Sequence, residues 1–437
     1  MSGFSYRRGE LFAEAVPVAE IAAAVGTPVY VYSANAVRAR LRAFAAAFAD
    51  LPALFCYALK ANPNLAILRL LAAEGAGADT VSGGEIERAL AAGMPPERIV
   101  FAGVAKTDEE MRLGLGRGIY QFNVESAEEL ERLAAVARAA GTTAPVAIRV
   151  NPDVAAETHD KISTGRRGDK FGIPLEEATA VYERAAGLPG VAAVGVHLHI
   201  GSQITGLGPF ARAYRRGVEL WRDLRARGIA VERIDFGGGF GIRYREETPV
   251  DPVALAALVR DLLGGAACRL IFEPGRALVG EAGILVSRVI YRKETRAGRF
   301  LVVDAGMQTL LRPALYDAWH DIFPVREPPP GTPLLVMDVV GPICESSDVL
   351  GRDRRLPPLS RGELIAIGAA GAYGAAMVSN YNSRPRPAEV LVDGDRWAVI
   401  KPRLEPAAQF ADEVVPSWLP GPDAQDRPSG SHGDADD

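Results

Sequence analysis

The sequence is poor in the residues that build disulfide frameworks and zinc sites. Its 437 residues include three cysteines and five histidines. Cys56, Cys268 and Cys344 are too few and too scattered to form a disulfide framework or a zinc cage. We expect Cys56 and Cys268, which lie in apolar stretches, to be core residues. The cysteine usage predicts a reducing, cytoplasmic location.

An excess of one charge and long apolar runs are also missing. Lysine and arginine number 49 against 54 acidic residues, a net charge of −5 that argues against nucleic-acid binding and gives no attraction to anionic membranes. No stretch of about 20 uninterrupted apolar residues is present. The apolar run at residues 21–25 is too short for the core of a signal peptide. We therefore expect neither a nucleic-acid nor a membrane partner.

Glycine and proline, in contrast, are abundant. The 46 glycines and 31 prolines are spread along the chain in short clusters, which indicates many tight turns and close backbone approaches. Hydrophobic residues make up 48% and charged residues 24%, the proportions of an ordinary folded protein. The length fits two or three domains.

Between residues 50 and 275, short apolar runs alternate with helical patterns. The runs are nearly continuous in hydrophobicity, as in parallel strands that are buried on both faces. There are eight of them, at residues 54–59, 78–81, 99–102, 120–123, 146–150, 194–198, 234–236 and 270–272. Seven helical segments lie between the runs, and the amphipathic segment 35–49 could supply an eighth. This pattern predicts a TIM (β/α)8 barrel, with a doubly wound sheet as the alternative.

The pattern changes after residue 280 to β-rich runs. They lie at residues 284–291, 300–303, 334–340, 364–367 and 390–400, and Asp393-Gly394 is typical of a hairpin turn. We therefore predict a barrel domain over residues 26–276 and a mainly β domain built from residues 1–25 and 277–418. Residues 419–437 are polar and rich in Gly, Pro and Asp, so we expect a disordered tail.

Reactive residues lie where the predicted strands end, which is where TIM barrels place their chemistry. Lys60 ends the first run and Asp79 lies at the end of the second. A buried lysine tends to lose its proton, and a neutral amine is the nucleophile that condenses with a carbonyl. A lysine that reaches solvent from the barrel rim is the alternative interpretation.

The loops after the seventh and eighth strands carry a glycine pattern typical of phosphate binding. Gly238 and Gly239 belong to the first loop, and Gly275 and Arg276 belong to the second. Loops at these two places form the usual phosphate site of such barrels, and glycine lets backbone N–H groups point at an anion. A lysine nucleophile beside a phosphate site suggests either pyridoxal phosphate or an aldolase-type Schiff base.

Glu273, at the end of the eighth strand, favours pyridoxal phosphate. A carboxylate beside the pyridine nitrogen keeps it protonated and strengthens the ring as an electron sink, which an aldolase does not need. His199 could lie against the ring, or could pair with His197 on a metal. The other three histidines are scattered through a loop, the second domain and the tail, so we predict no metal.

Eight ordered motifs carry a family resemblance. They are YALKAN at 57–62, HIGSQ at 199–203, GGGFG at 237–241, EPGR at 273–276, DAGM at 304–307, RPALY at 312–316, GPICES at 341–346 and GAYG at 371–374. With these motifs the chain resembles the diaminopimelate decarboxylases, which are alanine-racemase-like, fold type III pyridoxal phosphate enzymes. The resemblance runs from about Phe4 to Val415.

The resemblance implies roles for individual residues. Lys60 would hold the cofactor covalently, with Asp79 beside it, His199 stacked on the ring and Glu273 at its nitrogen. The residues around the phosphate or its edge would be Ser202, Gly238, Gly239, Gly275, Arg276 and Tyr373. Those toward the substrate would be Arg276, Arg312, Tyr316, Glu345 and Tyr373. Cys344 and Glu345 would enter the partner's site across a homodimer interface, with Cys344 or Lys60 as the acid that reprotonates the product carbon.

The implied reaction is the decarboxylation of meso-2,6-diaminopimelate to L-lysine and CO₂. Two arginines and a tyrosine suit a carboxylate at the far end of the substrate, and Glu345 suits an ammonium there. A decarboxylase of D-ornithine, D-lysine or carboxynorspermidine is the main alternative. A racemase would be expected to place arginine instead of Glu273 at the pyridine nitrogen. A catalytically silent cofactor-binding protein would not need Arg312, Tyr316 and Cys344 together.

Overall fold

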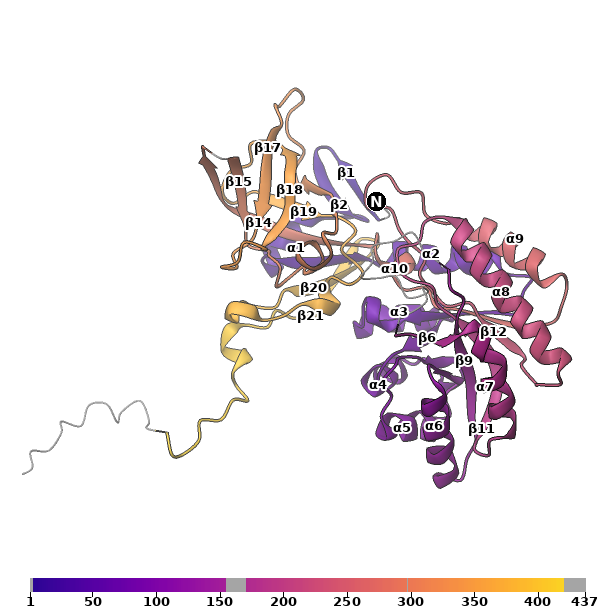
Figure 1. The fold of residues 1–437 in the computed structure, drawn as a ribbon. Helices are drawn as coiled ribbons and strands as arrows, with labels where there is room; N and C mark the ends of the chain where they lie inside the picture. Colours follow the sequence, from indigo (N-terminus) through magenta and orange to yellow (C-terminus); the bar gives the residue numbers. More distant parts are fainter. Residues whose placement is uncertain (1–2, 155–169, 297, 420–437) are drawn as a thin grey trace, which may run out of the picture.

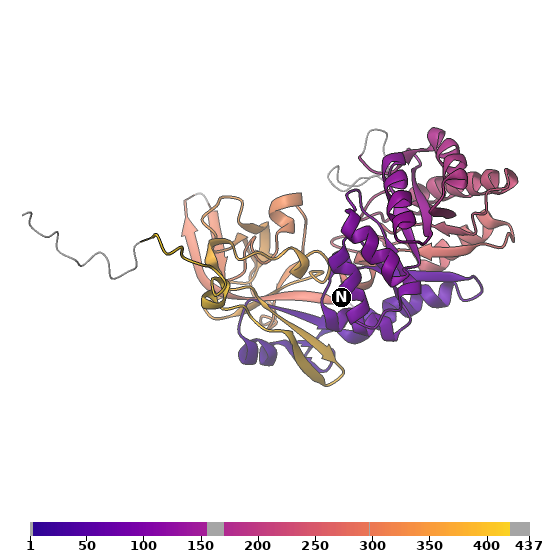
Figure 2. The same cartoon turned by 90° about the horizontal axis from the view of Figure 1, so that it is seen from below.

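The chain forms two lobes that are joined along one side (Figures 1 and 2). The computed structural model describes residues 3–154, 170–296 and 298–419. One lobe contains the helices α3 to α9 and the other contains most of the β-strands that follow residue 280. Within the described residues, no helix combines the length and apolar character that crossing a membrane requires.

The first lobe is a closed barrel of eight parallel strands, as predicted. Neighbours run in the order β5, β6, β7, β8, β9, β11, β12 and β13, and β13 pairs with β5 to close the ring. The strands are β5 (Ala53–Ala58), β6 (Gly77–Thr80), β7 (Ile99–Phe101), β8 (Gln121–Val124), β9 (Ala144–Asn151), β11 (Val191–Leu198), β12 (Arg233–Asp235) and β13 (Arg269–Phe272). A two-residue strand, β10 (Ile173–Pro174), is added beside β9. Each predicted apolar run overlaps one barrel strand.

Helices surround the barrel. They are α2 (Ala34–Ala47), α3 (Leu65–Ala73), α4 (Gly83–Ala91), α5 (Asp108–Arg117), α6 (Ala127–Ala139), α7 (Leu175–Gly187), α8 (Leu207–Ala226) and α9 (Pro252–Leu263). The helix α2, which precedes the first barrel strand, lies beside both α3 and α9. It therefore completes the ring, as its amphipathic pattern predicted.

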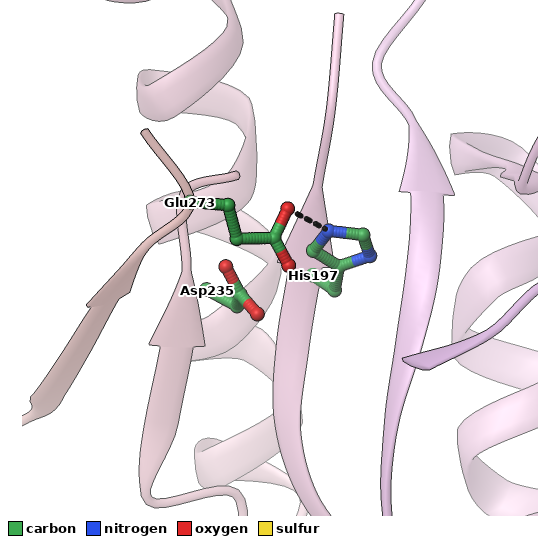
Figure 3. Close-up of side chains that lie close together, drawn as sticks. All are labelled: His197, Asp235 and Glu273. Carbon is green, nitrogen blue, oxygen red and sulfur yellow. Dashed lines mark ion pairs between the residues drawn. The ribbon is translucent and has the colours of Figure 1, made fainter. Parts of the chain in front are cut away.

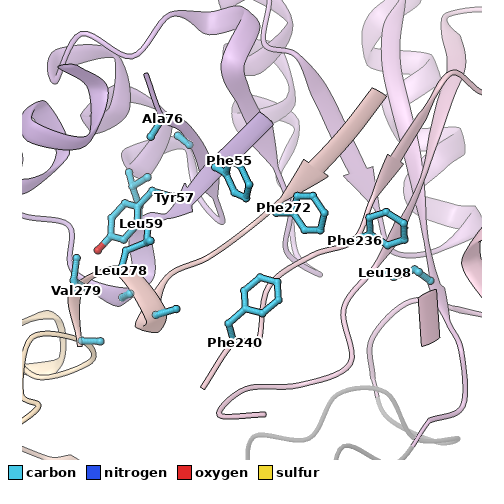
Figure 4. Packing of buried hydrophobic residues seen from close by; sticks show 14 of the residues in the cluster. Phe55, Tyr57, Leu59, Ala76, Leu198, Phe236, Phe240, Phe272, Leu278 and Val279 are labelled. Atoms are coloured by element: carbon cyan, nitrogen blue, oxygen red, sulfur yellow. The ribbon is translucent and has the colours of Figure 1, made fainter. Parts of the chain in front are cut away.

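Aromatic rings fill the space between three neighbouring barrel strands and the helices (Figure 4). The rings of Phe55 and Phe236 lie 5.4 and 5.5 Å from the ring of Phe272. Phe48, at the end of α2, packs on Phe272 at 4.7 Å. Burying one such side chain contributes about 1.5–3 kcal/mol, so this row holds α2 against the barrel. Cys56 and Cys268 are buried, as expected of core residues.

The second lobe is built on a long sheet with the order β18, β17, β15, β14, β4, β20 and β21, in which β19 pairs with β14 and with β16. Its strands are β4 (Val29–Ser33), β14 (Gly283–Thr295), β15 (Gly298–Val303), β16 (Ile322–Pro324), β17 (Leu335–Val340), β18 (Val349–Leu356), β19 (Leu364–Ile367), β20 (Ala388–Asp393) and β21 (Arg396–Lys401). The predicted hairpin joins β20 to β21, and Gly394 takes the positive φ of 69° that such a turn requires.

The strand β4 corrects the predicted domain boundary. It pairs with β14 and β20 in the second sheet, so residues 29–33 do not belong to the barrel, although the predicted barrel domain began at residue 26. The apolar run of β4 is indistinguishable by pattern from a barrel strand. The barrel lobe therefore begins with α2. The predicted disordered tail lies outside the described residues, apart from residue 419.

The described part of the N-terminal segment packs on the second lobe. The strands β1 (Phe4–Arg7), β2 (Glu10–Ala13) and β3 (Val16–Pro17) form a small antiparallel sheet that is followed by α1 (Val18–Val25). Leu11 donates its N–H to the carbonyl of Val325, and its side chain joins a buried cluster with Val31 and Ile284.

Two chain segments lie where the lobes meet at the open end of the barrel. The short helix α10 (Arg276–Val279) follows β13 and leads into β14. The loop after β19 returns to the barrel, where Tyr373 donates its N–H to the carbonyl of Ala61 at 2.7 Å. Residues from both lobes therefore meet beside the carboxyl ends of the barrel strands.

Candidate active site

Lys60 lies at the mouth of the barrel in an ion pair with Asp79. The 3-10 turn η1 (Leu59–Ala61) follows β5 directly and carries Lys60. Its Nζ lies 2.9 Å from Oδ2 of Asp79 on the adjacent strand β6. The Asp79 side chain is fully buried, whereas that of Lys60 is 36% exposed. The lysine side chain is thus held by Asp79 at its amine and remains partly accessible.

The charge state of Lys60 differs from the prediction. Burial alone lowers the pKa of Lys60, as expected, but the Asp79 carboxylate more than offsets burial and raises the pKa above its usual value. Burial and the nearby Glu273 in turn raise the pKa of Asp79 to about 7, which Lys60 opposes. A neutral amine therefore requires Lys60 to give up its proton, and Asp79 is the adjacent group that can accept it.

Glu273 lies inside the mouth with His197 and Asp235 (Figure 3). One ligand atom from each of these residues lies within 4.8 Å of those of the other two. Nε2 of His197 lies 3.4 Å from Oε2 of Glu273. His197 comes from β11, Asp235 from β12, and Glu273 follows β13, so three adjacent strands form the cluster. His197 therefore points toward the carboxylate of Glu273.

The side chain of Asn123 links the two carboxylates of this cluster. Its Nδ2 donates to Oδ2 of Asp235 at 3.2 Å and to Oε1 of Glu273 at 3.1 Å. Burial alone raises the pKa of Glu273, but the His197 and Lys60 side chains lower it to about 2. Burial and the charge of Glu273 hold the pKa of Asp235 well above its usual range. Glu273 is thus the anion of the pair and Asp235 the neutral acid.

His199 lies beside the glycine run, with its Nδ1 accepting the N–H of Gly238 at 3.3 Å. Burial lowers the pKa of His199 well below its usual value, so the ring is neutral. A Cβ at Gly238 would lie 2.2 Å from the carbonyl oxygen of Glu273. At Gly239, where φ is +95°, a Cβ would lie 2.4 Å from the carbonyl oxygen of Gly201. A side chain at either position would clash with a neighbouring loop, so both positions require glycine.

Arg276, at the start of α10, contacts other residues that were predicted to surround the phosphate. Its guanidinium donates to Oγ of Ser202 at 2.9 Å and to the hydroxyl of Tyr244 at 2.7 Å. The ring centroid of Tyr373 lies 4.7 Å from Cζ of Arg276, within cation–π range. A Cβ at Gly275 would lie 3.0 Å from Cβ of Ala58, so this loop also lies close to the barrel strand that precedes Lys60.

Arg312 enters the same region from the second lobe. It opens the short helix α11 (Arg312–Tyr316), and its Nη1 lies 2.7 Å from Nε2 of His320. Cζ of Arg312 lies 4.7 Å from the ring centroid of Tyr244, on which Arg276 also converges. Tyr316, at the end of α11, is half-buried. Arg276 and Arg312 are each 6% exposed, and neither forms an ion pair with any carboxylate among the described residues.

Cys344 and Glu345 are exposed in the loop between β17 and β18. Nδ2 of Asn382 donates to Sγ of Cys344 at 3.3 Å, and the hydroxyl of Tyr381 donates to Glu345 at 2.6 Å. Within the described part of the chain, neither residue forms a hydrogen bond or ion pair with Lys60 or Glu273. The structure therefore does not bring this predicted pair into the barrel mouth of its own chain.

Four residues of the site were not predicted to take part in it: Asn123, Asp235, Tyr244 and His320. Asp235 carries a signal that could have found it, because it is the one charged residue in the predicted apolar run at residues 234–236. Asn123 ends the predicted strand at residues 120–123, and nothing else in the sequence distinguishes it. Tyr244 and His320 lie in loops, where no periodicity indicates the direction of a side chain.

A comparison with known families identifies the barrel. The family described as "Pyridoxal-dependent decarboxylase, pyridoxal binding domain" matches residues 34–280. A diaminopimelate decarboxylase of Pseudomonas aeruginosa is 50% identical over 415 residues, covering 95% of this chain and 99% of that protein. The chain belongs to the diaminopimelate decarboxylase family of pyridoxal-dependent decarboxylases. The match to the family begins at residue 34, the first residue of α2.

Solved structures of other diaminopimelate decarboxylases share the whole architecture. The M. jannaschii enzyme, solved in complex with L-lysine, superposes with a TM-score of 0.90 at 38% identity, covering 95% of this chain and 98% of that chain. The Helicobacter pylori enzyme, also complexed with L-lysine, gives a TM-score of 0.86 at 40% identity and covers 90% and 98% of the two chains. The predicted barrel with a second, mainly β domain is thus confirmed.

The barrel mouth fits the pyridoxal phosphate cofactor of this family. Oδ1 of Asp79, Nε of Arg276 and both ring nitrogens of His197 are buried atoms that make no hydrogen bond with a described residue. The buried guanidinium of Arg276 and the tightly packed glycines suit a phosphate, and anionic Glu273 suits a protonated ring nitrogen. Lys60 supplies an amine on a partly accessible side chain at the same mouth.

Proposed function

We propose that this protein decarboxylates meso-2,6-diaminopimelate to L-lysine and CO₂ with pyridoxal phosphate. The observation that carries the proposal is the pair of buried guanidiniums, Arg276 and Arg312, that converge on Tyr244 without a carboxylate partner among the described residues. A buried cation is costly unless it is paired, so these two cations favour an anionic ligand. One suits the cofactor phosphate and the other a substrate carboxylate.

The residues of the barrel mouth would perform the proton and charge steps. When bound, the cofactor supplies an electron sink for the carbon–carboxylate bond that breaks. Lys60 would hold the cofactor, and Asp79 would take up or return the proton of its Nζ. Anionic Glu273 would favour a proton on the ring nitrogen, and neutral His199 would lie against the ring without adding charge.

The substrate's far end would be recognised by charge. A carboxylate there would meet Arg312, whose planar guanidinium can bind both carboxylate oxygens. D-Ornithine, D-lysine and carboxynorspermidine carry no carboxylate at the far end and would leave a buried cation unpaired. This difference favours diaminopimelate over those substrates.

We also propose that the enzyme is a cytoplasmic homodimer with shared sites. Cys344 and Glu345 are exposed and lie apart from the barrel mouth of their own chain, as residues offered to a partner would be. In that arrangement, Cys344 would donate the proton that the product carbon needs, and Glu345 would bind the substrate's distal ammonium. The free thiols of all three cysteines fit a reducing compartment.

The direct test is turnover. The protein is incubated with pyridoxal phosphate and meso-diaminopimelate, and CO₂ and L-lysine are measured. We expect stoichiometric formation of both, and a kcat/KM higher than for D-lysine, D-ornithine or carboxynorspermidine. Preferred turnover of any of those three would contradict the proposal.

A further inference from the structure

Arg312 is held in place by an uncharged side chain. Its Nη1 lies 2.7 Å from Nε2 of His320, which is fully buried. On the opposite side of the imidazole, Nδ1 lies 2.8 Å from the carbonyl oxygen of Gly368. His320 thus lies between the Arg312 guanidinium, which can only donate a hydrogen bond, and the Gly368 carbonyl, which can only accept one.

These two neighbours determine the protonation state of His320. A backbone carbonyl can only accept, so Nδ1 must carry a proton. A guanidinium can only donate, so Nε2 must offer its lone pair to Arg312. Only the neutral Nδ1–H tautomer satisfies both contacts. Burial and the charge of Arg312 agree with this assignment, because they lower the pKa of His320 to about 3.

A neutral acceptor leaves the positive charge of Arg312 available. An aspartate or glutamate in this place would neutralise the guanidinium and would compete with an anionic ligand. His320 takes up one of the five N–H donors of Arg312 and adds no charge. The remaining donors and the full charge can therefore serve a carboxylate.

The position of His320 is itself fixed by the fold. Gly368 follows β19 and donates its N–H to the carbonyl of Asp321 at 2.8 Å, so the His320 loop is attached to the sheet at two places. The ring of Tyr244 packs edge-on against His320, with centroids 5.3 Å apart and planes at 79°. The same tyrosine lies against Arg312. The imidazole and the guanidinium are thus locked in one arrangement.

We propose that His320 is a positioning residue that aims Arg312 at the carboxylate on the far end of the substrate and so sets the specificity for a substrate with two carboxylates. This proposal rests on the proposed function, because it takes Arg312 as the residue that binds that carboxylate. His320 touches neither the reacting carbon nor the amine of Lys60, and it acts through Arg312 alone.

Two amide variants test the two hydrogen bonds of His320 one at a time. In His320→Asn, the amide N–H₂ can replace Nδ1 and donate to Gly368, but nothing accepts from Arg312. In His320→Gln, the amide oxygen can reach the place of Nε2 and accept from Arg312. D-Lysine is the matched substrate without a distal carboxylate, and L-lysine is the product that keeps it.

We expect His320→Asn to lower the ratio of kcat/KM for meso-diaminopimelate to kcat/KM for D-lysine by about 10-fold or more, since a hydrogen bond to a charged group is lost. The loss should fall mainly on KM, and the Kd for L-lysine measured by calorimetry should rise by a similar factor. His320→Gln should lie much closer to wild type in both measurements. The visible absorbance of the bound cofactor should be unchanged in both variants.

Equal losses on meso-diaminopimelate and D-lysine in His320→Asn would overturn the proposal, as would a His320→Gln variant that is as impaired as His320→Asn. If wild type does not convert meso-diaminopimelate, both this proposal and the proposed function fail. If wild type converts it and Arg312→Ala impairs it, but His320→Asn does not, only the role of His320 fails. The melting temperature of the cofactor-free protein shows whether a variant has lost its fold.

Discussion

Asp235 and Glu273 are two buried carboxylates that share one amide donor but differ in charge. Nδ2 of Asn123 lies 3.2 Å from the first and 3.1 Å from the second. Like charges this close cannot both be ionised at low cost, so one carboxyl takes the proton. Neighbouring side chains determine which carboxyl takes the proton. His197 and Lys60 favour the ionised form of Glu273, and Asp235 remains neutral. The anion is therefore at the position that faces the barrel mouth.

The two carboxyls should respond differently to the loss of a charge. Glu273→Gln removes the anion that favours a protonated ring nitrogen, so we expect kcat to fall by about 10²-fold or more. Asp235→Asn replaces a neutral acid with a neutral amide of the same shape and should lower kcat by less than about 10-fold. Steady-state kinetics of the two variants, with the cofactor content checked by absorbance, makes the comparison. A larger loss in Asp235→Asn would show that the negative charge lies there instead.

The ion pair between Lys60 and Asp79 should set the pH dependence of cofactor attachment. Lys60 reacts only as the neutral amine, and Asp79 raises its pKa, so attachment to the cofactor-free wild type should accelerate as the pH rises through the neutral and alkaline range. Asp79→Asn removes the anion and lowers the pKa of Lys60. The rate profile should therefore shift to lower pH.

Stopped-flow absorbance after mixing the cofactor-free protein with pyridoxal phosphate measures this profile. Lys60→Ala is the control and should give neither the absorbance of the covalent link nor turnover. An unshifted profile in Asp79→Asn would mean that Asp79 does not govern the charge of Lys60. Retained absorbance in Lys60→Ala would remove the assignment of the lysine itself.

Arg312 should contribute to specificity more than to stability. Its guanidinium is 6% exposed and has no acidic partner among the described residues, so Arg312→Ala removes an unpaired buried charge from the free protein. We expect kcat/KM for meso-diaminopimelate to fall by about 10²-fold or more, with no loss of melting temperature in the cofactor-free state. Arg312→Lys keeps the charge without the planar fork and should give an intermediate value. Unchanged turnover of diaminopimelate in Arg312→Ala would exclude it as the specificity residue.

A shared site predicts complementation between two inactive variants. If Cys344 of one chain serves the Lys60 of its partner, a mixed dimer of Lys60→Ala and Cys344→Ala contains one intact site. Random mixing should then restore about a quarter of the wild-type activity. Refolding or co-expressing the two variants, followed by an activity assay, tests this. Activity no higher than that of the separate variants would mean that each chain completes its own site.

The residues that could be predicted from sequence are those whose neighbours along the chain fix their direction. Each predicted apolar run overlaps a barrel strand, and a strand end specifies where Lys60, His199 and Glu273 must lie. The charge of Lys60 could not be read in this way, because it depends on Asp79, which becomes a neighbour only when β5 and β6 pair. Asp235 and Asn123 are 112 residues apart, and only closure of the barrel brings them together.

The residues outside the barrel were harder to predict from the sequence, because their neighbours also come from other parts of the chain. β4 has the composition of a barrel strand, and only its pairing with β14 and β20 reveals its domain. The residue pair Arg312 and His320 is only eight positions apart, but the turn between them depends on Asp317, a non-glycine residue with a φ of 50°. Local propensity does not predict such a turn.

The two connections between the lobes, from β4 into α2 and from α10 into β14, are neighbours in one sheet. β4 and β14 pair in antiparallel fashion from Gly283 and Tyr32 onward, and Ser33 donates its N–H to the carbonyl of Ala282 just beyond the last pair. Because the two crossings are hydrogen-bonded to each other, we expect a bend between the lobes to move both of them together. For the same reason, a fragment that begins after residue 33 would keep the barrel sequence whole but would leave the second sheet without an interior strand.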